Sequence, residues 1–179
     1  MTPEALARQL APIAAPLVDW YRQNARVLPW RENTDPYRVW VSEIMLQQTR
    51  VTAVIPYYLR FLEALPTPAA LAACPEDRLM KLWEGLGYYS RARNMQKAAR
   101  VMVERYGGQL PSSFEDLKAL PGVGEYTAGA VASIALGLPC PAVDGNVLRV
   151  VSRLAASRAD IAAPQVKKVF SAALSAVIP

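Results

Sequence analysis

Apolar residues recur along most of the chain at the three- and four-residue spacing of amphipathic helices. The spacing is clearest over residues 89–106, where one helical face collects Ala92, Met95, Ala99, Met102, Val103 and Tyr106. Comparable patterns predict helices over residues 3–23, 36–48, 50–64, 68–73, 76–85, 113–119, 125–137, 145–155 and 163–177. Nearly every segment has this helical rather than an alternating periodicity, and none is a convincing strand. The pattern therefore predicts an all-α fold with short connections.

One uncharged stretch is long enough to raise the question of a membrane helix. It runs from Tyr126 to Val143 and approaches the length of a membrane-spanning segment. Gly137, Pro139 and Pro141 break its second half, which favours a buried helix followed by a turn. We therefore expect no membrane partner.

The composition excludes several kinds of chemistry. With 179 residues, 53% of them hydrophobic and 20% charged, the chain is typical of a globular domain rather than a disordered segment. It contains no histidine, which excludes histidine bases, catalytic triads and histidine metal ligands. Cys74 and Cys140 are too few for a thiolate metal or iron–sulfur site, so we expect no cofactor within the chain. Two cysteines without a framework, and no charged-then-apolar leader before residue 20, indicate a reducing cytoplasmic setting.

The excess of basic residues lies in one segment. Twenty lysines and arginines against fifteen acidic residues give a net charge of +5, which permits a polyanionic partner. The segment from Arg78 to Arg105 holds seven basic and two acidic residues, a surplus as large as that of the whole chain. Its candidate phosphate neighbours are Arg91, Arg93, Lys97 and Arg100.

The motif Leu120-Pro121-Gly122-Val123-Gly124 lies between two predicted helices. Its two glycines allow a tight turn that brings unpaired N–H groups at a helix N-terminus towards an anion. By itself, a PGVG sequence is compatible with an ordinary turn between helices. The complete motif with a helix on each side favours phosphate binding, and it resembles the helix-hairpin-helix of DNA-binding proteins.

Two carboxylates are candidates for acid and base chemistry. Glu43 interrupts an otherwise apolar helix next to Trp40, Ile44 and Leu46, and burial there would raise its pKa enough for a general acid. Asp144 precedes the helix that begins near residue 146. The alternatives are a solvated surface glutamate and an aspartate that only caps its helix. A protonated carboxyl group and an ionised one are together what glycosidic cleavage requires.

Two further segments combine aromatic and basic residues. The loop from Leu86 to Arg93 could wedge into a base stack, or its tyrosines could cap the core. Residues 20–31 could line a pocket for a planar base, or could anchor the N-terminal helix. The relevant side chains there are Trp20, Tyr21, Arg26, Leu28, Trp30 and Arg31.

Five motifs together resemble one protein family. They appear in the family's order and spacing, and the resemblance covers roughly residue 15 to the end. The five runs are Leu28–Arg31, Trp40–Thr49, Gly85–Asn94, Leu120–Gly124 and Val143–Val147. In this combination they closely resemble the MutY family of bacterial adenine DNA glycosylases, within the helix-hairpin-helix superfamily that includes endonuclease III.

The resemblance implies removal of adenine mispaired with 8-oxoguanine or guanine. In that family the glutamate corresponding to Glu43 protonates adenine N7, and the aspartate corresponding to Asp144 stabilises the sugar cation with Asn146 beside it. Tyr126 stands where endonuclease III enzymes carry a Schiff-base lysine, which implies hydrolysis without strand cleavage. The adenine pocket carried over from the family comprises Arg26, Trp30, Arg31 and Leu46. The DNA-binding positions are Gln48, Thr49, Leu86, Gly87, Tyr88, Arg91, Gly122, Val123 and Gly124.

The resemblance also implies a partner and a domain organisation. We expect a monomer that binds double-stranded DNA with adenine:8-oxoguanine or adenine:guanine mispairs, in the bacterial cytoplasm at the nucleoid. Full-length family members continue with four cysteines that hold a [4Fe-4S] cluster and with a domain that helps read 8-oxoguanine. Residues 1–179 contain neither, which suggests a truncated catalytic domain with an N-terminal helix near 3–23 and a six-helix core near 30–155. The alternatives are a DNA-binding fragment without turnover and a bifunctional glycosylase/lyase of the endonuclease III type.

Overall fold

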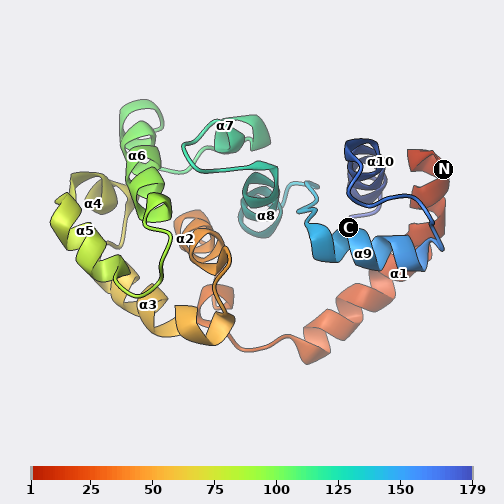
Figure 1. The fold of residues 1–179 in the computed structure, drawn as a ribbon, viewed down its shortest axis with the longest axis horizontal. Helices are drawn as coiled ribbons and strands as arrows, with labels where there is room; N and C mark the ends of the chain where they lie inside the picture. Colours follow the sequence, from red (N-terminus) through yellow and green to blue (C-terminus); the bar gives the residue numbers. More distant parts are fainter. Residues whose placement is uncertain (1, 179) are drawn as a thin grey trace. The chain divides into compact units, whose positions relative to one another are not determined.

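The structure, a computed structural model, describes residues 2–178 (Figure 1). Its helices are α1 (Pro3–Asn24), the 3₁₀ helix η1 (Pro29–Arg31), α2 (Pro36–Leu46), α3 (Val51–Ala64), α4 (Pro68–Ala73), α5 (Glu76–Trp83), α6 (Ser90–Arg105), α7 (Phe114–Lys118), α8 (Glu125–Leu136), α9 (Gly145–Leu154) and α10 (Pro164–Ser175). No strand occurs among the described residues, which confirms the predicted all-α fold. Within the same residues, no helix is both long and apolar enough to cross a membrane.

The helix α2 ends earlier than its apolar pattern predicts. It starts as expected, because the Asp35 side chain accepts a hydrogen bond from the Arg38 N–H at 2.8 Å and Pro36 occupies the first turn. It stops at Leu46 rather than at residue 48, since Gln47 leaves helical geometry and Gln48 adopts a left-handed conformation with φ 56°. Gln48 therefore lies in a turn, which we call the Gln48 turn (residues 47–49).

The chain divides into two compact units, and the first combines its two ends. Residues up to 26 pack with residues from 138 onward, so that α1, α9 and α10 form one body. Its core consists of Leu6, Leu10, Val143, Leu148, Val151, Ala155, Phe170 and Ala173. This division differs from the expected core of residues 30–155, because the apolar face of α9 packs with α1 and α10.

The second unit, residues 27–137, is organised around α2. This helix packs against α3, α6, α8 and η1, and it is buried on most of its circumference. Trp40 is fully buried, as are Phe61 and Trp83, whose rings meet edge to face at 6.1 Å. Because α2 is the central helix, polar side chains that it carries near its end are held by contacts on several sides.

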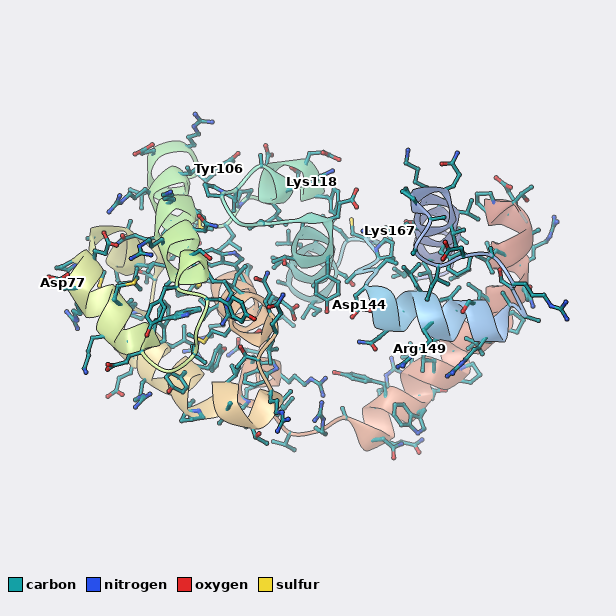
Figure 2. All side chains as sticks on the ribbon, in the orientation of Figure 1. Asp77, Tyr106, Lys118, Asp144, Arg149 and Lys167 are labelled. Atoms are coloured by element: carbon teal, nitrogen blue, oxygen red, sulfur yellow. The ribbon has the colours of Figure 1, made fainter. Side chains whose placement is uncertain are left out.

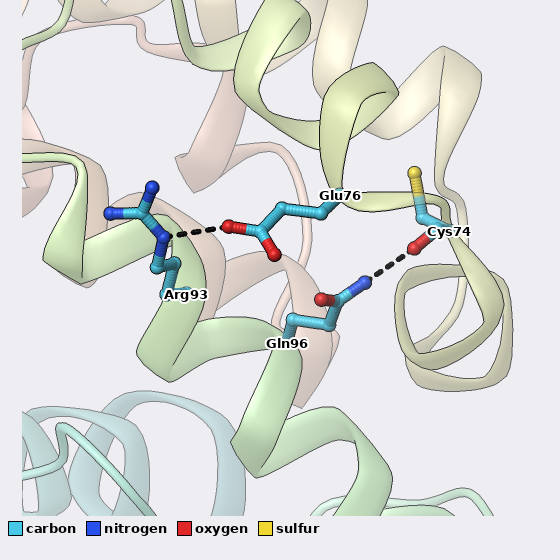
Figure 3. A network of polar contacts seen from close by, with 4 residues as sticks. All are labelled: Cys74, Glu76, Arg93 and Gln96. Atoms are coloured by element: carbon cyan, nitrogen blue, oxygen red, sulfur yellow. Dashed lines mark hydrogen bonds and ion pairs between the residues drawn. The ribbon is translucent and has the colours of Figure 1, made fainter.

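The helix α6 is tied to its neighbours by polar side chains as well as by its apolar face. Gln96 is buried, and its Nε2 donates to the carbonyl oxygens of Leu71 and Cys74 at the end of α4 (Figure 3). Arg93 Nε donates to Glu76 Oε1 at 2.8 Å, which joins α6 to the start of α5 (Figure 3). These contacts join α6 to the end of α4 and to the start of α5.

The separate cores generate a first testable prediction. Replacing Phe170 by alanine should lower the free energy of unfolding of the first unit by about 3–5 kcal/mol, because a large buried ring is lost. Hydrogen exchange resolved by peptide should show faster exchange in α1, α9 and α10. Phe61→Ala is the matched change in the second unit. Equal loss of protection in both units for either variant would contradict independent cores.

Candidate functional site

The predicted hairpin is formed by α7 and α8 with the turn Ala119–Gly124 between them. Gly122 has φ +77°, and a Cβ added there would lie 2.8 Å from Asn94 Cβ on α6, so this position requires glycine. Gly124 is different, since it has φ −93° and open space where a side chain would project. The tight turn therefore requires glycine at Gly122, whereas the backbone at Gly124 would accept another residue. Val123 is buried and anchors the turn in the core.

The hairpin presents the N-terminus of α8. Gly124 is the N-cap residue, and no side chain caps this helix. The backbone N–H groups of its first turn can therefore be offered to an external acceptor, where the helix dipole favours negative charge. Tyr126, in that first turn, is 40% exposed. The N-cap residue Gly124 carries no side chain that could compete with an anion at this end of α8.

A cleft of about 230 Å³ connects the hairpin to two other segments of the second unit. It is lined by Ile44, Gln47, Ser90, Arg91, Asn94, Met95, Pro121 and Gly122. Gln47 Nε2 also lies 3.4 Å from Thr127 Oγ1, so the end of α2 is joined to α8. The hairpin turn, the Gln48 turn and the start of α6 consequently form one continuous surface.

Gln48 and Thr49 differ in how far they are available to a ligand. The Gln48 side chain is exposed at the tip of its turn. The Thr49 hydroxyl lies 3.3 Å from the Gln47 carbonyl oxygen and accepts a bond from Arg91 Nη2 at 3.2 Å. Gln48 is thus presented outward, whereas the polar atom of Thr49 is engaged within the protein.

The loop before α6 presents one of its expected DNA contacts and buries another. Tyr88 is 62% exposed and has φ 47°, so it projects from a turn that we call the Tyr88 turn (residues 86–88). Leu86 is only 6% exposed, and its expected insertion into DNA does not fit this structure because its side chain is part of the core. Gly87 lies between them, and its carbonyl oxygen accepts a bond from Trp83 Nε1 at 3.0 Å.

Arg91, an expected phosphate neighbour, has most of its hydrogen-bonding capacity directed at the protein. The side chain is buried, with 8% exposure, and its guanidinium donates to six acceptors in the Gln48 turn, the end of α2 and the Tyr88 turn. Both terminal nitrogens of Arg91 are therefore engaged within the protein, although the side chain also lines the cleft. Of the other candidate phosphate neighbours, Arg93 is paired with Glu76 and Lys97 is exposed.

Glu43 lies on α2 between the buried side chains of Ser42 and Ile44. It is partly buried, and loss of solvation raises the pKa of its carboxyl group above the ordinary value. The alternative of a freely solvated surface glutamate is therefore wrong. A raised pKa keeps more of the carboxyl group protonated near neutral pH, which is the form that can donate a proton.

Asp144 caps α9 in the first unit, as its alternative interpretation proposed. Its Oδ1 accepts from the Val147 N–H at 2.8 Å, and its Oδ2 accepts from Asn146 Nδ2 at 3.2 Å. Asn146 Oδ1 in turn accepts from Arg149 Nη2 at 3.3 Å, on the helix where Figure 2 labels Asp144 and Arg149. Capping does not remove Asp144 from chemistry, because these donors fix the orientation of its carboxyl group.

The expected base-pocket residues fall in both units. Arg26 is exposed and belongs to the first unit, while Trp30, Arg31 and Leu46 belong to the second. Trp30 is 8% exposed and meets the Tyr58 ring edge to face at 5.4 Å, so its indole is held rigidly. The alternative for residues 20–31 is that their aromatic side chains anchor the N-terminal helix. Trp20 and Tyr21 do not fit this alternative, because they are 59% and 46% exposed.

Sequence reasoning missed Ser90 and Asn94 as lining residues of the cleft. They are four residues apart on one face of α6, roughly opposite the apolar face that the sequence pattern identified. That spacing was the available signal, but nothing in the sequence shows which element this polar face meets.

The residues do not fit a [4Fe-4S] cluster, which needs about four thiolate ligands. The chain has two cysteines, and they lie in different units. Among the described residues, no three histidine, cysteine, aspartate or glutamate side chains gather as a metal site.

The all-α fold and the α7–α8 hairpin define a helix-hairpin-helix protein. Residues 41–176 match the family described as HhH-GPD superfamily base excision DNA repair protein. The chain belongs to this superfamily.

Proteins named adenine DNA glycosylase are among its similar relatives. The rat protein is 50% identical over 153 residues, which cover 80% of this chain and 30% of that protein. The human protein is 47% identical over 167 residues, covering 87% and 31%. The Mycobacterium tuberculosis protein is 40% identical over 153 residues, covering 85% and 50%. The chain thus spans about 30% of the length of the mammalian relatives.

Solved structures show the same fold. A thermostable thymine-DNA glycosylase superposes with a TM-score of 0.78 at 24% identity, over 93% of this chain and 84% of that one. A trapped endonuclease III–DNA covalent intermediate superposes with a TM-score of 0.74 at 26% identity, over 96% and 84%.

The contrast between the two hairpin glycines can be tested. Gly122→Ala should destabilise the fold by more than about 1–2 kcal/mol, because a left-handed alanine is strained and its methyl group overlaps Asn94. Gly124→Ala should leave the free energy of unfolding within about 0.5 kcal/mol of the wild-type value. It should nevertheless weaken duplex DNA binding, since the methyl group stands where a phosphate would approach. Denaturant unfolding and fluorescence anisotropy measure the two effects, and equal destabilisation by both changes would contradict this account.

Proposed function

We propose that this chain is the DNA-binding and catalytic part of an adenine DNA glycosylase. It would hydrolyse the N-glycosidic bond of adenine paired with 8-oxoguanine or guanine. The observation that carries the proposal is the contrast between two carboxyl groups. Glu43 is partly buried with a raised pKa, whereas the Asp144 carboxylate is held by an N–H group and an amide. The adenine DNA glycosylases at 40–50% identity support the choice of base.

In the proposed mechanism, Glu43 acts on the base. Its carboxyl proton passes to N7 of the extruded adenine, and the bond between the base and the sugar C1′ then breaks with its electron pair going to the base. The positive charge that remains on the sugar is stabilised by the carboxylate of Asp144. Water adds to C1′ and loses a proton, so that the products are free adenine and an abasic site.

The environment of Asp144 suits this electrostatic role. A carboxylate that accepts bonds from Val147 N–H and Asn146 Nδ2 has a defined orientation before substrate arrives. Preorganised charge stabilises a cationic transition state without the cost of reorienting solvent. The bond from Arg149 to Asn146 supports the amide that holds Asp144.

The proposed DNA contacts come from the hairpin and the two neighbouring turns. The uncapped α8 N-terminus would bind a phosphate, and the exposed side chains of Gln48 and Tyr88 would meet the bases or sugars. The endonuclease III structures of similar fold were solved with DNA, which supports duplex DNA as the partner.

The role of Glu43 predicts a specific loss. Glu43→Gln should lower single-turnover adenine excision by about 10²–10⁴, because the amide keeps the shape but cannot donate a proton. DNA affinity should be retained, and in the wild type the excision rate should fall as pH rises through the raised pKa of Glu43. Glu63→Gln changes an exposed glutamate on α3 and serves as the matched control. Excision by Glu43→Gln within about tenfold of the wild type would exclude general-acid catalysis by this residue.

The tyrosine at position 126 predicts base removal without cleavage of the DNA strand. The wild-type chain should leave an intact abasic strand that is cut only by later treatment with alkali, because a phenol cannot form a Schiff base with the sugar. Tyr126→Lys should give a borohydride-trapped complex if the residue faces the sugar, whereas Tyr126→Phe should give none. Strong trapping by the wild type would instead indicate a glycosylase/lyase.

A further inference from the structure

One buried guanidinium joins the Gln48 turn, which contributes Gln47 to the cleft, to the Tyr88 turn. Arg91 Nη1 donates to the backbone oxygens at the end of α2 and in the Gln48 turn, namely those of Ile44 at 3.0 Å, Met45 at 2.9 Å and Gln47 at 2.7 Å. Arg91 Nη2 donates across to the Tyr88 turn and to the threonine hydroxyl, namely to Leu86 O at 3.0 Å, Gly87 O at 3.2 Å and Thr49 Oγ1 at 3.2 Å. Nη1 is thus committed to the end of α2 and the adjoining Gln47, whereas Nη2 is committed mainly to the Tyr88 turn.

Both turns contain a residue in an unfavourable backbone conformation. Gln48 has φ 56° and Tyr88 has φ 47°. These values lie in the left-handed region of backbone conformation, which residues other than glycine rarely adopt. Such residues are strained and persist only where surrounding contacts impose them. Here the contacts are the charge-assisted bonds from Arg91 to the carbonyl oxygens next to each strained residue.

The strained residues are also the ones whose side chains project outward. Gln48 is exposed and Tyr88 is 62% exposed, although their neighbours Gln47 and Leu86 are partly or fully buried. The guanidinium lies 5.6 Å from the Tyr88 ring centre and 5.3 Å from that of Trp83. Arg91 therefore contacts Tyr88 in two ways, through the aromatic ring of the tyrosine and through the backbone of its turn.

We propose that Arg91 is a positioning residue that sets the Gln48 and Tyr88 turns in the conformation that DNA meets. The proposal rests on the proposed DNA-binding function of these turns. It assigns to one residue of α6 the relative placement of two DNA contacts that are about 40 residues apart in the sequence. Arg91 acts through the protein, because both of its terminal nitrogens donate to protein acceptors and only 8% of the residue is exposed.

The geometry requires arginine rather than positive charge alone. A guanidinium presents a planar fork of donors, and two of its nitrogens can serve two separate sets of carbonyl groups. A lysine at this position keeps the charge but concentrates its donors on one atom, which cannot bridge both turns. Arg91→Lys therefore separates a positioning role from a simple contribution to electrostatic attraction.

The test compares Arg91→Lys with Gln96→Met in the 179-residue chain. Gln96 lies on the same helix and is also buried, but its amide bonds the end of α4 and neither turn. Hydrogen exchange reports the two turns without DNA, through the bonds from Thr49 N–H to Leu46 O at 3.2 Å and from Leu86 N–H to Trp83 O at 3.0 Å. Anisotropy with an adenine:8-oxoguanine duplex at several salt concentrations reports binding.

We expect Arg91→Lys to speed exchange in both turns. Duplex binding should weaken by about tenfold or more, because a turn that has lost about one charge-assisted hydrogen bond to residue 91 must be ordered again when DNA binds. The salt dependence of binding should stay unchanged, because no phosphate contact is lost. Gln96→Met should leave exchange in the turns and duplex affinity at wild-type values. Arg91→Gln, which keeps a planar amide, should show the same pattern and serves if the lysine variant does not fold.

Three results would overturn the proposal. The first is unchanged exchange in the two turns of Arg91→Lys. The second is an equal loss of affinity in Gln96→Met. The third is a salt slope reduced by about 0.9, which would indicate a direct phosphate contact by Arg91. If the wild-type chain binds no duplex DNA, the proposed function fails, and exchange alone then decides whether Arg91 holds the turns.

Discussion

A single buried cation imposes the local geometry of the candidate DNA-binding surface. Among the described residues no carboxylate forms an ion pair with Arg91, so its charge is balanced by backbone carbonyl oxygens and a hydroxyl group. Burying a guanidinium is costly unless nearly all its donors are satisfied. The end of α2, the Gln48 turn and the Tyr88 turn must therefore stay around it, and each is held in a shape that it would not keep alone.

The hairpin of α7 and α8 contacts α6 and the Gln48 turn through close packing and a neutral hydrogen bond rather than through charge. Gly122 lies so near Asn94 that only glycine fits, and Gln47 is bonded to Thr127 at the start of α8. α6 therefore meets the hairpin through Asn94 and the two turns through Arg91. A helix whose apolar face is buried and whose polar face carries these two contacts gives the surface its rigidity.

The two carboxyl groups proposed for catalysis acquire their properties from different physical effects. Removal from water favours the neutral form of Glu43, whereas the Asp144 carboxyl group is oriented by hydrogen bonds from Val147 N–H and Asn146 Nδ2. Each environment is local to one unit of the chain: Glu43 depends on the burial of α2, and Asp144 depends on the first turn of α9. The division of labour between an acid and an electrostatic stabiliser is thus built into separate elements of the fold.

The sequence by itself determined the helices, the hairpin and the family, because apolar periodicity and glycine or proline at helix ends are local signals. The candidate acid Glu43 could also be identified from the sequence, since its apolar neighbours lie within one helical turn. Only the tertiary structure decided that Arg91 is buried, that Leu86 belongs to the core and that Gly124 is free of steric constraint. An arginine among other basic residues is predicted to be solvated, and a leucine in a glycine-flanked loop to be exposed. Their real surroundings come from residues up to 47 positions away, and no local pattern encodes such contacts.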